Sequence, residues 1–354
     1  MKAKRSHKLD RLAKLYDAEI LPIWSQRFGR MLLRRLAVPP KAMVLDVGAG
    51  TGYPALEVLR RMDDHGRIIS IDASSAMLDV AREKAGALGG KRIFFRSESV
   101  EPRLGFAEEV FDLVLSNLAL QDLDAPAQAV SEFARVAKSG GRVIATFPLA
   151  GTFEEFHDLF REVLIQSDRM EALERLDAYL ASLPTAKAAR RWFEAAGLVD
   201  VEVEHESYKL LFKSSREFFF APVIEYGPLL MWKEIAGKGE EMQDVFWRVK
   251  EAIDAYFAGQ SFTVTVKAAC AVGRKPTEEE RQAVIEAERV EAGVGEGDGL
   301  ELAIGTDQIE IMESTRTVRV GDDDDDEDLD EELLRNTASP SAALPNPPKK
   351  GVRR

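Results

Sequence analysis

The sequence predicts an α/β protein built on a doubly wound, mostly parallel sheet of seven strands. Three observations support this fold class. Short apolar runs alternate with helical segments over residues 42–147, which is typical of strand-helix-strand units. Three alternating glycines stand directly after the first apolar run. Two later apolar runs, separated by helical material, would complete the sheet with an antiparallel edge.

The glycine turn, residues 48–52, gives the strongest indication of function. Gly48, Gly50 and Gly52 carry no Cβ and tolerate positive φ, so a nucleotide-like ligand can lie against their backbone. A helix predicted directly behind them would point its free N–H groups at that ligand. Asp72 follows at the end of the next apolar run, where a carboxylate can accept hydrogen bonds from both ribose hydroxyls. We therefore expect a nucleotide site; the alternative is an ordinary tight turn followed by a surface aspartate.

The elements before and after this turn follow in order. Apolar residues spaced by three and four over residues 9–36, interrupted by Pro22, predict two amphipathic helices in an N-terminal lid, residues 1–40. We expect strands over 42–47, 67–72, 92–96, 111–116 and 141–147, and helices near 53–62, 74–86 and 126–138. The Gly140-Gly141 pair should end the last of these helices.

Residues 41–275 form the predicted main domain. The second half of this domain is mainly helical. Helices are expected over 153–166, 169–182 and 184–196, and strands over 198–204 and 262–273. The segment between these strands, about residues 206–260, is rich in aromatic residues and predicts a helical insert. Such an insert could be a lid lining a substrate pocket or a helical pair with an ordinary packed core.

The last part of the chain gives weaker signals. Residues 276–320 read as an extension with a charged helix over 277–292 and a short hairpin over 299–320. Residues 321–354 predict a disordered tail, first acidic and then basic. Ten acidic residues lie in 322–332, so the net charge of −13 comes mostly from this tail and the remainder is nearly neutral. Composition therefore offers no support for a nucleic-acid partner.

Composition also limits the cellular setting and the chemistry. No apolar run approaches the roughly 20 residues of a membrane span, and the N-terminus has no signal-peptide core, so we expect a cytoplasmic protein without a membrane partner. A single cysteine, Cys270, and four scattered histidines argue against a metal site. The oligomeric state is left open.

The motifs separate two classes of nucleotide-binding enzyme. A nicotinamide oxidoreductase needs a third glycine of G-x-G-x-x-G where Tyr53 stands, so that reading is disfavoured. The pattern Asp46-x-Gly48-x-Gly50-x-Gly52 instead resembles the first motif of the class I S-adenosylmethionine-dependent methyltransferases. Four further stretches, in the order expected of that family, share the resemblance: residues 71–78, 95–99, 110–121 and 135–143.

This resemblance implies S-adenosylmethionine as cofactor and assigns roles to individual residues. Gly48, Gly50 and Gly52 would hold the methionine end and Asp46 would orient their loop. Asp72 would bind the ribose, beside Ala73, and Met77 would pack on adenine. Glu98 and Ser99 would lie beside the adenine amine, although Glu98 replaces the usual aspartate. Asn117 would line the methionine portion, and Tyr16, unless it is simply a packing residue, would close over the cofactor.

The implied reaction is in-line transfer of a methyl group to a small-molecule or carrier-bound acyl acceptor. Within the family, residues 115–121 and 147–156 most resemble the malonyl-acyl-carrier-protein O-methyltransferases and related small-molecule enzymes. The donor is already activated, so positioning supplies most of the catalysis and a base is needed only for a protonated acceptor. His157 is a candidate base, although a lone histidine on a helix is more often structural. A non-catalytic module that binds the cofactor is the alternative from another functional class.

Overall fold

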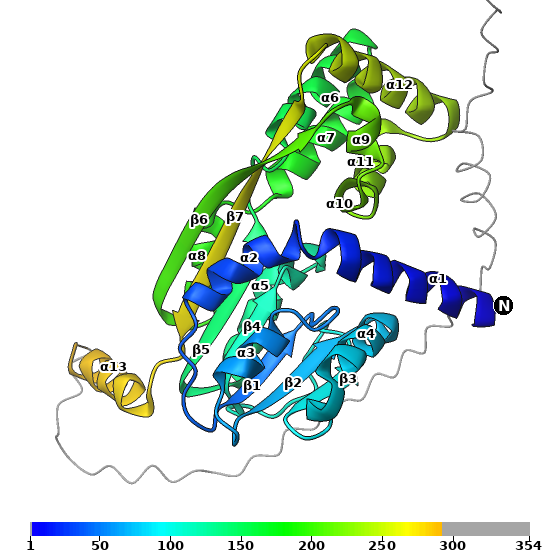
Figure 1. Cartoon of the computed structure of the whole chain (residues 1–354). Helices are drawn as coiled ribbons and strands as arrows, with labels where there is room; N and C mark the ends of the chain where they lie inside the picture. The colour runs from blue at the N-terminus through cyan, green and yellow to red at the C-terminus, as the bar shows by residue number, and fades with distance from the viewer. Residues whose placement is uncertain (1, 292–354) are drawn as a thin grey trace, which may run out of the picture. The chain divides into compact units, whose positions relative to one another are not determined.

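Seven strands form a single sheet in the order β3-β2-β1-β4-β5-β7-β6 in the computed structural model, which describes residues 2–291 (Figure 1). The strands are β1 (Met43–Val47), β2 (Arg67–Asp72), β3 (Ile93–Ser97), β4 (Phe111–Asn117), β5 (Ala137–Pro148), β6 (Val199–Phe212) and β7 (Phe262–Arg274). Strands β1 to β5 pair in parallel, whereas β7 runs antiparallel to both β5 and β6. The predicted doubly wound sheet of seven strands is therefore confirmed.

The beginning of β5 differs from the sequence-based expectation. Helix α5 (Pro126–Val136) ends before the Gly140-Gly141 pair, and the strand already begins at Ala137, which pairs with Phe111. A register irregularity between Phe111 and Leu113 absorbs the extra residues. Gly140 takes a positive φ of 73° within this bulge, so the glycine bends a strand where we had expected it to stop a helix.

Helices cover both faces of the sheet. On one face lie α2 (Ser25–Arg34), against β4, β5 and β7, and α3 (Ala55–Arg61) and α4 (Ser75–Ala85), against β2 and β3. On the other face α5 and α8 (Ala186–Ala195) pack on each other and on β4 to β7. Their apolar core joins Phe111, Phe133 and Phe193, all fully buried. None of the helices in residues 2–291 is long and apolar enough to cross a membrane.

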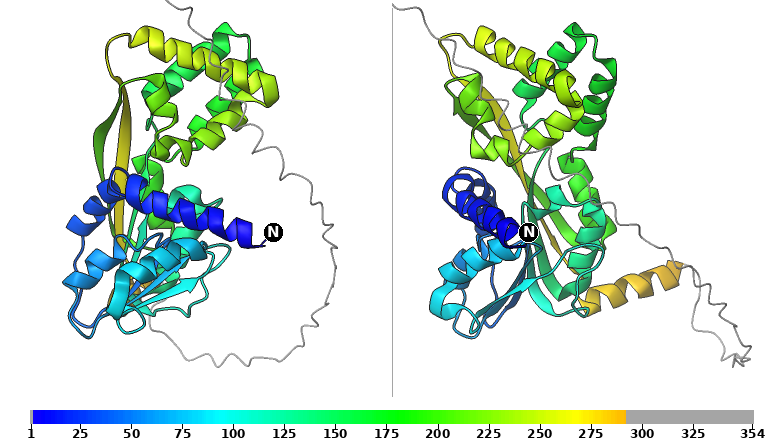
Figure 2. Two further views of the ribbon diagram at one scale, coloured as in Figure 1. Left: turned by 45° about the vertical axis from the view of Figure 1, so that its right-hand side comes forward. Right: turned by 90° about the vertical axis from the view of Figure 1, so that its right-hand side faces the viewer.

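The N-terminal lid consists of two helices, as predicted, joined by an unexpected π-helical turn. Helix α1 (Lys2–Leu15) lies beside α4 and passes into the turn η1 (Tyr16–Ile20), and a turn containing Pro22 then leads to α2 (Figures 1 and 2). The Leu21 N–H donates to the Tyr16 carbonyl at 2.8 Å and closes this wide turn. Short π-helical segments often mark functional positions.

A helical cap stands on the two long strands β6 and β7 (Figure 2). It comprises α6 (Glu154–Gln166), α7 (Met170–Ser182), α9 (Ser215–Phe219), α10 (Pro222–Glu225), α11 (Leu229–Ala236) and α12 (Gly239–Tyr256). The insert was expected from about residue 206, but β6 continues to Phe212 because its residues pair with β7 up to Phe262. The helices between these strands therefore begin at Ser215, and the cap also includes α6 and α7.

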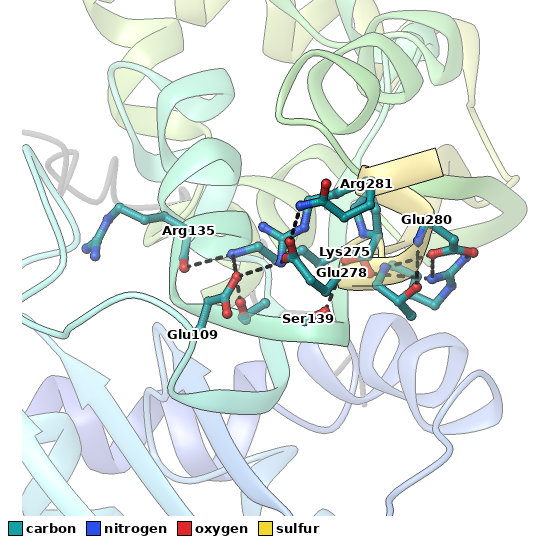
Figure 3. Close-up of polar contacts among 12 residues, drawn as sticks. Glu109, Arg135, Ser139, Lys275, Glu278, Glu280 and Arg281 are labelled. Carbon is teal, nitrogen blue, oxygen red and sulfur yellow. Dashed lines mark hydrogen bonds and ion pairs between the residues drawn. The ribbon is translucent and has the colours of Figure 1, made fainter. Parts of the chain in front are cut away.

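Helix α13 (Glu278–Glu291) follows β7 and agrees with the predicted charged helix. Its first turn is held by ion pairs: Arg274 binds Glu280, and Arg281 and Lys275 both bind Glu109 (Figure 3). Thr277 and Glu280 also cap the helix reciprocally, each side chain accepting the other residue's backbone N–H. The predicted hairpin over 299–320 and the predicted tail over 321–354 lie outside the described residues.

Two small connecting elements complete the description. The turn η2 (Gly86–Leu88) follows α4. The turn η3 (Ala119–Asp122) follows β4 at its carboxyl end and packs on β5 and α5. Because parallel strands end at the same edge of a sheet, η3, the glycine turn after β1 and Asp72 at the end of β2 meet there.

Candidate cofactor site

The glycine turn folds tightly against its neighbours. The Gly48 and Ala49 N–H groups both donate to the Ile71 carbonyl at 2.9 Å, which ties the turn to β2. Gly48 has a φ of 74°, and a Cβ built on it would lie 2.3 Å from the Ala119 Cβ of η3. Only glycine fits such a position. Helix α3 begins at Ala55, and the Leu56 N–H donates to the Gly52 carbonyl at 3.0 Å, so the helix opens behind the glycines as expected.

Asp72 organises the backbone around this turn. One carboxylate oxygen accepts the Gly50 N–H at 2.8 Å, and the other accepts the Ser74 N–H at 2.8 Å, just before α4. Each oxygen retains a second lone pair that can accept a further hydrogen bond from a ligand. Asp72 thus fixes the glycine turn and remains able to bind a diol.

Asp46 lies below the turn, completely buried between β2 and β4. Its Oδ2 accepts a hydrogen bond from Ser70 at 3.2 Å, whereas its Oδ1 has no protein partner. Burial raises the pKa of Asp46 to about 7; the Ser70 hydrogen bond opposes this shift and the negative charge of Asp72 adds to it. A buried carboxylate with a free oxygen is costly unless a ligand satisfies it.

Tyr16 and Asn117 join the N-terminal lid to the strand ends. The Tyr16 ring lies 3.9 Å from the Cβ position built on Gly50, and its hydroxyl is 2.6 Å from the Ser25 Oγ. Asn117 donates to the Ser25 carbonyl at 3.3 Å and accepts a hydrogen bond from Thr146 at 2.8 Å. Both residues therefore lie at the edge of the sheet where the glycine turn lies. The Tyr16 ring packs against the turn.

Two further carboxylates lie near the turn; sequence reasoning assigned no role to Asp122 and noted Asp17 only as the partner of Tyr16 in a Tyr-Asp pair that resembles one of the family. Asp17 is hydrogen-bonded to Thr51 inside the glycine turn and to Lys84 of α4, each at 2.6 Å. Asp122, at the end of η3, has its pKa raised to about 6 by loss of solvation and by the charge of Asp72. Asp122 still reaches solvent, whereas Asp46 does not. The only sequence signal for these residues was the position of Asp17 next to Tyr16.

The residues assigned to adenine divide into two groups. Ala73 is exposed and Met77 is half-buried, both at the start of α4 beside Asp72. Glu98, in contrast, accepts the Gly105 N–H at 2.8 Å and forms an ion pair with Arg96 at 2.6 Å. Its carboxylate therefore also has protein partners, a role that the sequence did not suggest. The exposed Ser99 accepts the Glu101 N–H at 3.3 Å.

His157 is not placed to act as a base. It is 97% buried in the cap, where its Nε2 accepts a hydrogen bond from the Trp232 indole at 3.1 Å. Burial, aided by the nearby Arg161 charge, lowers the pKa of His157 to about 4. A base must offer a free lone pair to the acceptor, and this one is already engaged. The structural reading of His157 is therefore the better one.

Most aromatic residues of the cap form its core. Phe156, Phe218 and Trp232 are fully buried, and the Phe156 and Trp232 rings stack with their centroids 4.0 Å apart. Phe153 continues this cluster toward the lid, where Trp24 stacks on it at 5.8 Å and an interplanar angle of 13°. The aromatic insert is thus chiefly packing, and one edge of it meets the N-terminal lid.

Parts of this chain are similar to known proteins. Residues 45–145 match the family model described as a methyltransferase domain. Demethylmenaquinone methyltransferase of Staphylococcus aureus is 26% identical over 207 residues, which cover 56% of this chain and 83% of that protein. The YcgJ protein of Bacillus subtilis aligns with a TM-score of 0.47 and 18% identity, covering 71% of this chain and 99% of its own. A putative methyltransferase of Bacillus halodurans aligns with a TM-score of 0.45 and 20% identity, covering 70% and 99%.

The fold and the sequence similarity define an enzyme of the methyltransferase type. The chain is a class I S-adenosylmethionine-dependent methyltransferase. The described residues fit this donor at Asp72, because both of its carboxylate oxygens, beside the glycine turn, keep a lone pair that can bind a ribose diol.

Proposed function

We propose that this enzyme transfers the methyl group to an apolar small-molecule acceptor, held between the N-terminal lid and the cap. Gly48 to Gly52 and Asp72 hold the donor, Asp46 orients their loop, and Tyr16 covers it. Asn117 lies beside the methionine portion, and Ala73 and Met77 border the adenine. When bound, S-adenosylmethionine supplies a methyl group on a positively charged sulfur that needs no further activation.

The charge of the site is the observation on which the choice of ligand rests. Asp46, Asp72 and Asp122 surround the glycine turn and accept hydrogen bonds from neutral donors, while Asp17 is paired with Lys84. Such a negative site attracts a ligand that carries a sulfonium and an ammonium group. It would repel the pyrophosphate of a nicotinamide dinucleotide. This argues against the oxidoreductase alternative independently of Tyr53.

The proposed acceptor class is based on the part of the cap that contacts the lid. Helix α10 contacts η1, and α9 to α11 carry large apolar side chains that are exposed. These residues are Phe220, Tyr226, Leu230 and Met231. An apolar acceptor would cover such surface and gain about 25 cal/mol for each Å² buried. The Staphylococcus aureus relative, as its name states, acts on demethylmenaquinone.

No side chain needs to form a covalent intermediate in this reaction. The chain's contribution is to hold the acceptor atom in line with the methyl group and to exclude water, which can lower the barrier by up to about 7–11 kcal/mol. His157 takes no part, because its free nitrogen lone pair is already bonded to Trp232. Asp122 is the carboxylate nearest the solvent side of the cluster and could accept a proton from a hydroxyl acceptor.

The test combines binding and turnover. Calorimetry should detect S-adenosylhomocysteine binding to the wild type and a loss of about tenfold or more in Asp72→Asn, while the α4 control Asp79→Asn binds normally. A methyl-labelled donor is then incubated with apolar and aqueous extract fractions, and products that gain one methyl group are identified by mass. Label on a carrier protein would favour an acyl acceptor over the apolar one. Binding without any labelled product would favour a non-catalytic module.

A further inference from the structure

Asp17 connects three separate parts of the molecule through one carboxylate oxygen. The Thr51 hydroxyl, from the middle of the glycine turn, donates to its Oδ1 at 2.6 Å. The Lys84 ammonium, from the last turn of α4, donates to the same atom at 2.6 Å. The lid, the glycine turn and the helix that follows Asp72 are therefore fastened at one point, which we call the Asp17 clasp (Asp17, Thr51 and Lys84).

The clasp holds the lid directly over the proposed cofactor position. Tyr16, the residue before Asp17, lies against the glycine turn, 3.9 Å from the Cβ position built on Gly50. Both residues belong to η1, so the π-helical turn presents the cover and the fastening side by side. Helix α1 continues from this point along α4, which lies beside it in both figures (Figures 1 and 2).

The strength of the clasp suits a contact that opens and closes. The Thr51 side is dry, since Thr51 is 1% exposed, but the Asp17 and Lys84 side chains are about one-third exposed, at 28% and 34%. A partly exposed ion pair is weak and is screened by salt. The buried Thr51 hydrogen bond thus favours the closed lid, and the weak Lys84 ion pair allows the lid to open.

We propose that Lys84 is a positioning residue that holds the lid closed over the cofactor through Asp17, and that opening of this clasp limits cofactor entry and release of the demethylated product. The proposal rests on the proposed cofactor site. In this proposal Lys84 acts through Asp17 and not by contact with the cofactor or the acceptor.

The first experiment does not depend on the cofactor. Hydrogen exchange of the backbone amides in residues 10–24 is compared in the cofactor-free wild type, Lys84→Met and Lys187→Met. Lys187 is an exposed lysine of α8 and serves as the matched control. Lys84→Met should speed exchange in this segment by about two- to fivefold at low salt, and the control should not. Equal exchange in all three proteins would overturn the clasp.

The second experiment measures release of S-adenosylhomocysteine by rapid mixing. The release rate should rise about two- to fivefold in Lys84→Met, rise further in Asp17→Asn, and return toward the wild-type value in Lys84→Arg. The wild-type rate should also rise with salt and approach that of Lys84→Met. Release rates that are equal in the wild type and Lys84→Met would refute the gating role, whereas a wild type that binds no cofactor would refute the proposed function itself.

Discussion

Asp46 should make the stability of this protein fall as the pH rises. Burial raises its pKa to about 7 in the folded chain, against an ordinary value of 3.8. Between these two values the folded state binds a proton that the unfolded state has lost, so folding is increasingly penalised with rising pH. The loss begins near the unfolded pKa and is complete above the folded one, which is the reverse of the behaviour of a salt-bridged carboxylate.

The size of the effect follows from the shift. About three pKa units at 1.36 kcal/mol each give a total of about 4 kcal/mol, of which about 2–3 kcal/mol falls between about pH 5 and about pH 8.5. Urea unfolding of cofactor-free protein at these two pH values, for the wild type and Asp46→Asn, measures it. The wild type should lose this amount relative to the variant, because asparagine cannot ionise.

A companion variant tests the cause of the shift. Ser70→Ala removes the hydrogen bond that lowers the Asp46 pKa, so the loss of stability should extend to higher pH than in the wild type. If the wild type and Asp46→Asn lose equal stability over the range, Asp46 does not titrate there and the reasoning fails. Because a cationic donor favours the ionised carboxylate, its affinity should rise with pH through about pH 7 in the wild type but not in Asp46→Asn.

Three other predictions follow from single contacts. Gly48→Ala should abolish measurable cofactor binding, since its Cβ meets Ala119 at a positive φ; calorimetry that finds normal binding would contradict this packing. His157→Ala should lower the free energy of unfolding in urea by about 2–4 kcal/mol, because it leaves the Trp232 indole unpaired, and should not change the pH profile of turnover. Loss of a kinetic pKa with normal stability would instead indicate a base. Glu280→Gln should lower the helical circular dichroism signal slightly without altering cofactor affinity, since it weakens only the first turn of α13; an equal loss of affinity would show that this helix supports the site.

The sequence predicted the elements whose signal is local. The β1 strand, the glycine turn and Asp72 follow one another within one strand-turn-helix-strand unit, where the apolar runs, the glycines and the spaced acid together are typical of few structures. The parallel pairing of the first five strands followed in the same way from the alternation of strands and helices. The predicted positions of Tyr16 and Asn117 came from resemblance to a family, and their hydrogen bonds to Ser25 agree with a shared site.

What the sequence could not predict depends on contacts between distant residues. Lys84 lies in an ordinary amphipathic helix and gains its role only because Asp17 is brought beside it. The contact of Glu98 with the Gly105 backbone depends on a loop that folds back onto it. The end of β6 was placed too early, since its charged and apolar residues mix and only pairing with β7 keeps it extended. Tertiary contacts overrode local preference in each case.

The position of α2 has a consequence for how the protein is made. Residues near the N-terminus form this helix, yet it packs on β5 and β7, and Arg34 and Arg35 pair with Glu204, Glu206 and Glu202 of β6. Its partners are therefore synthesised more than a hundred residues later, and such non-local contacts form slowly. During synthesis α2 can meet β4 and β5 first, but its contact surface is complete only after β7 has been made.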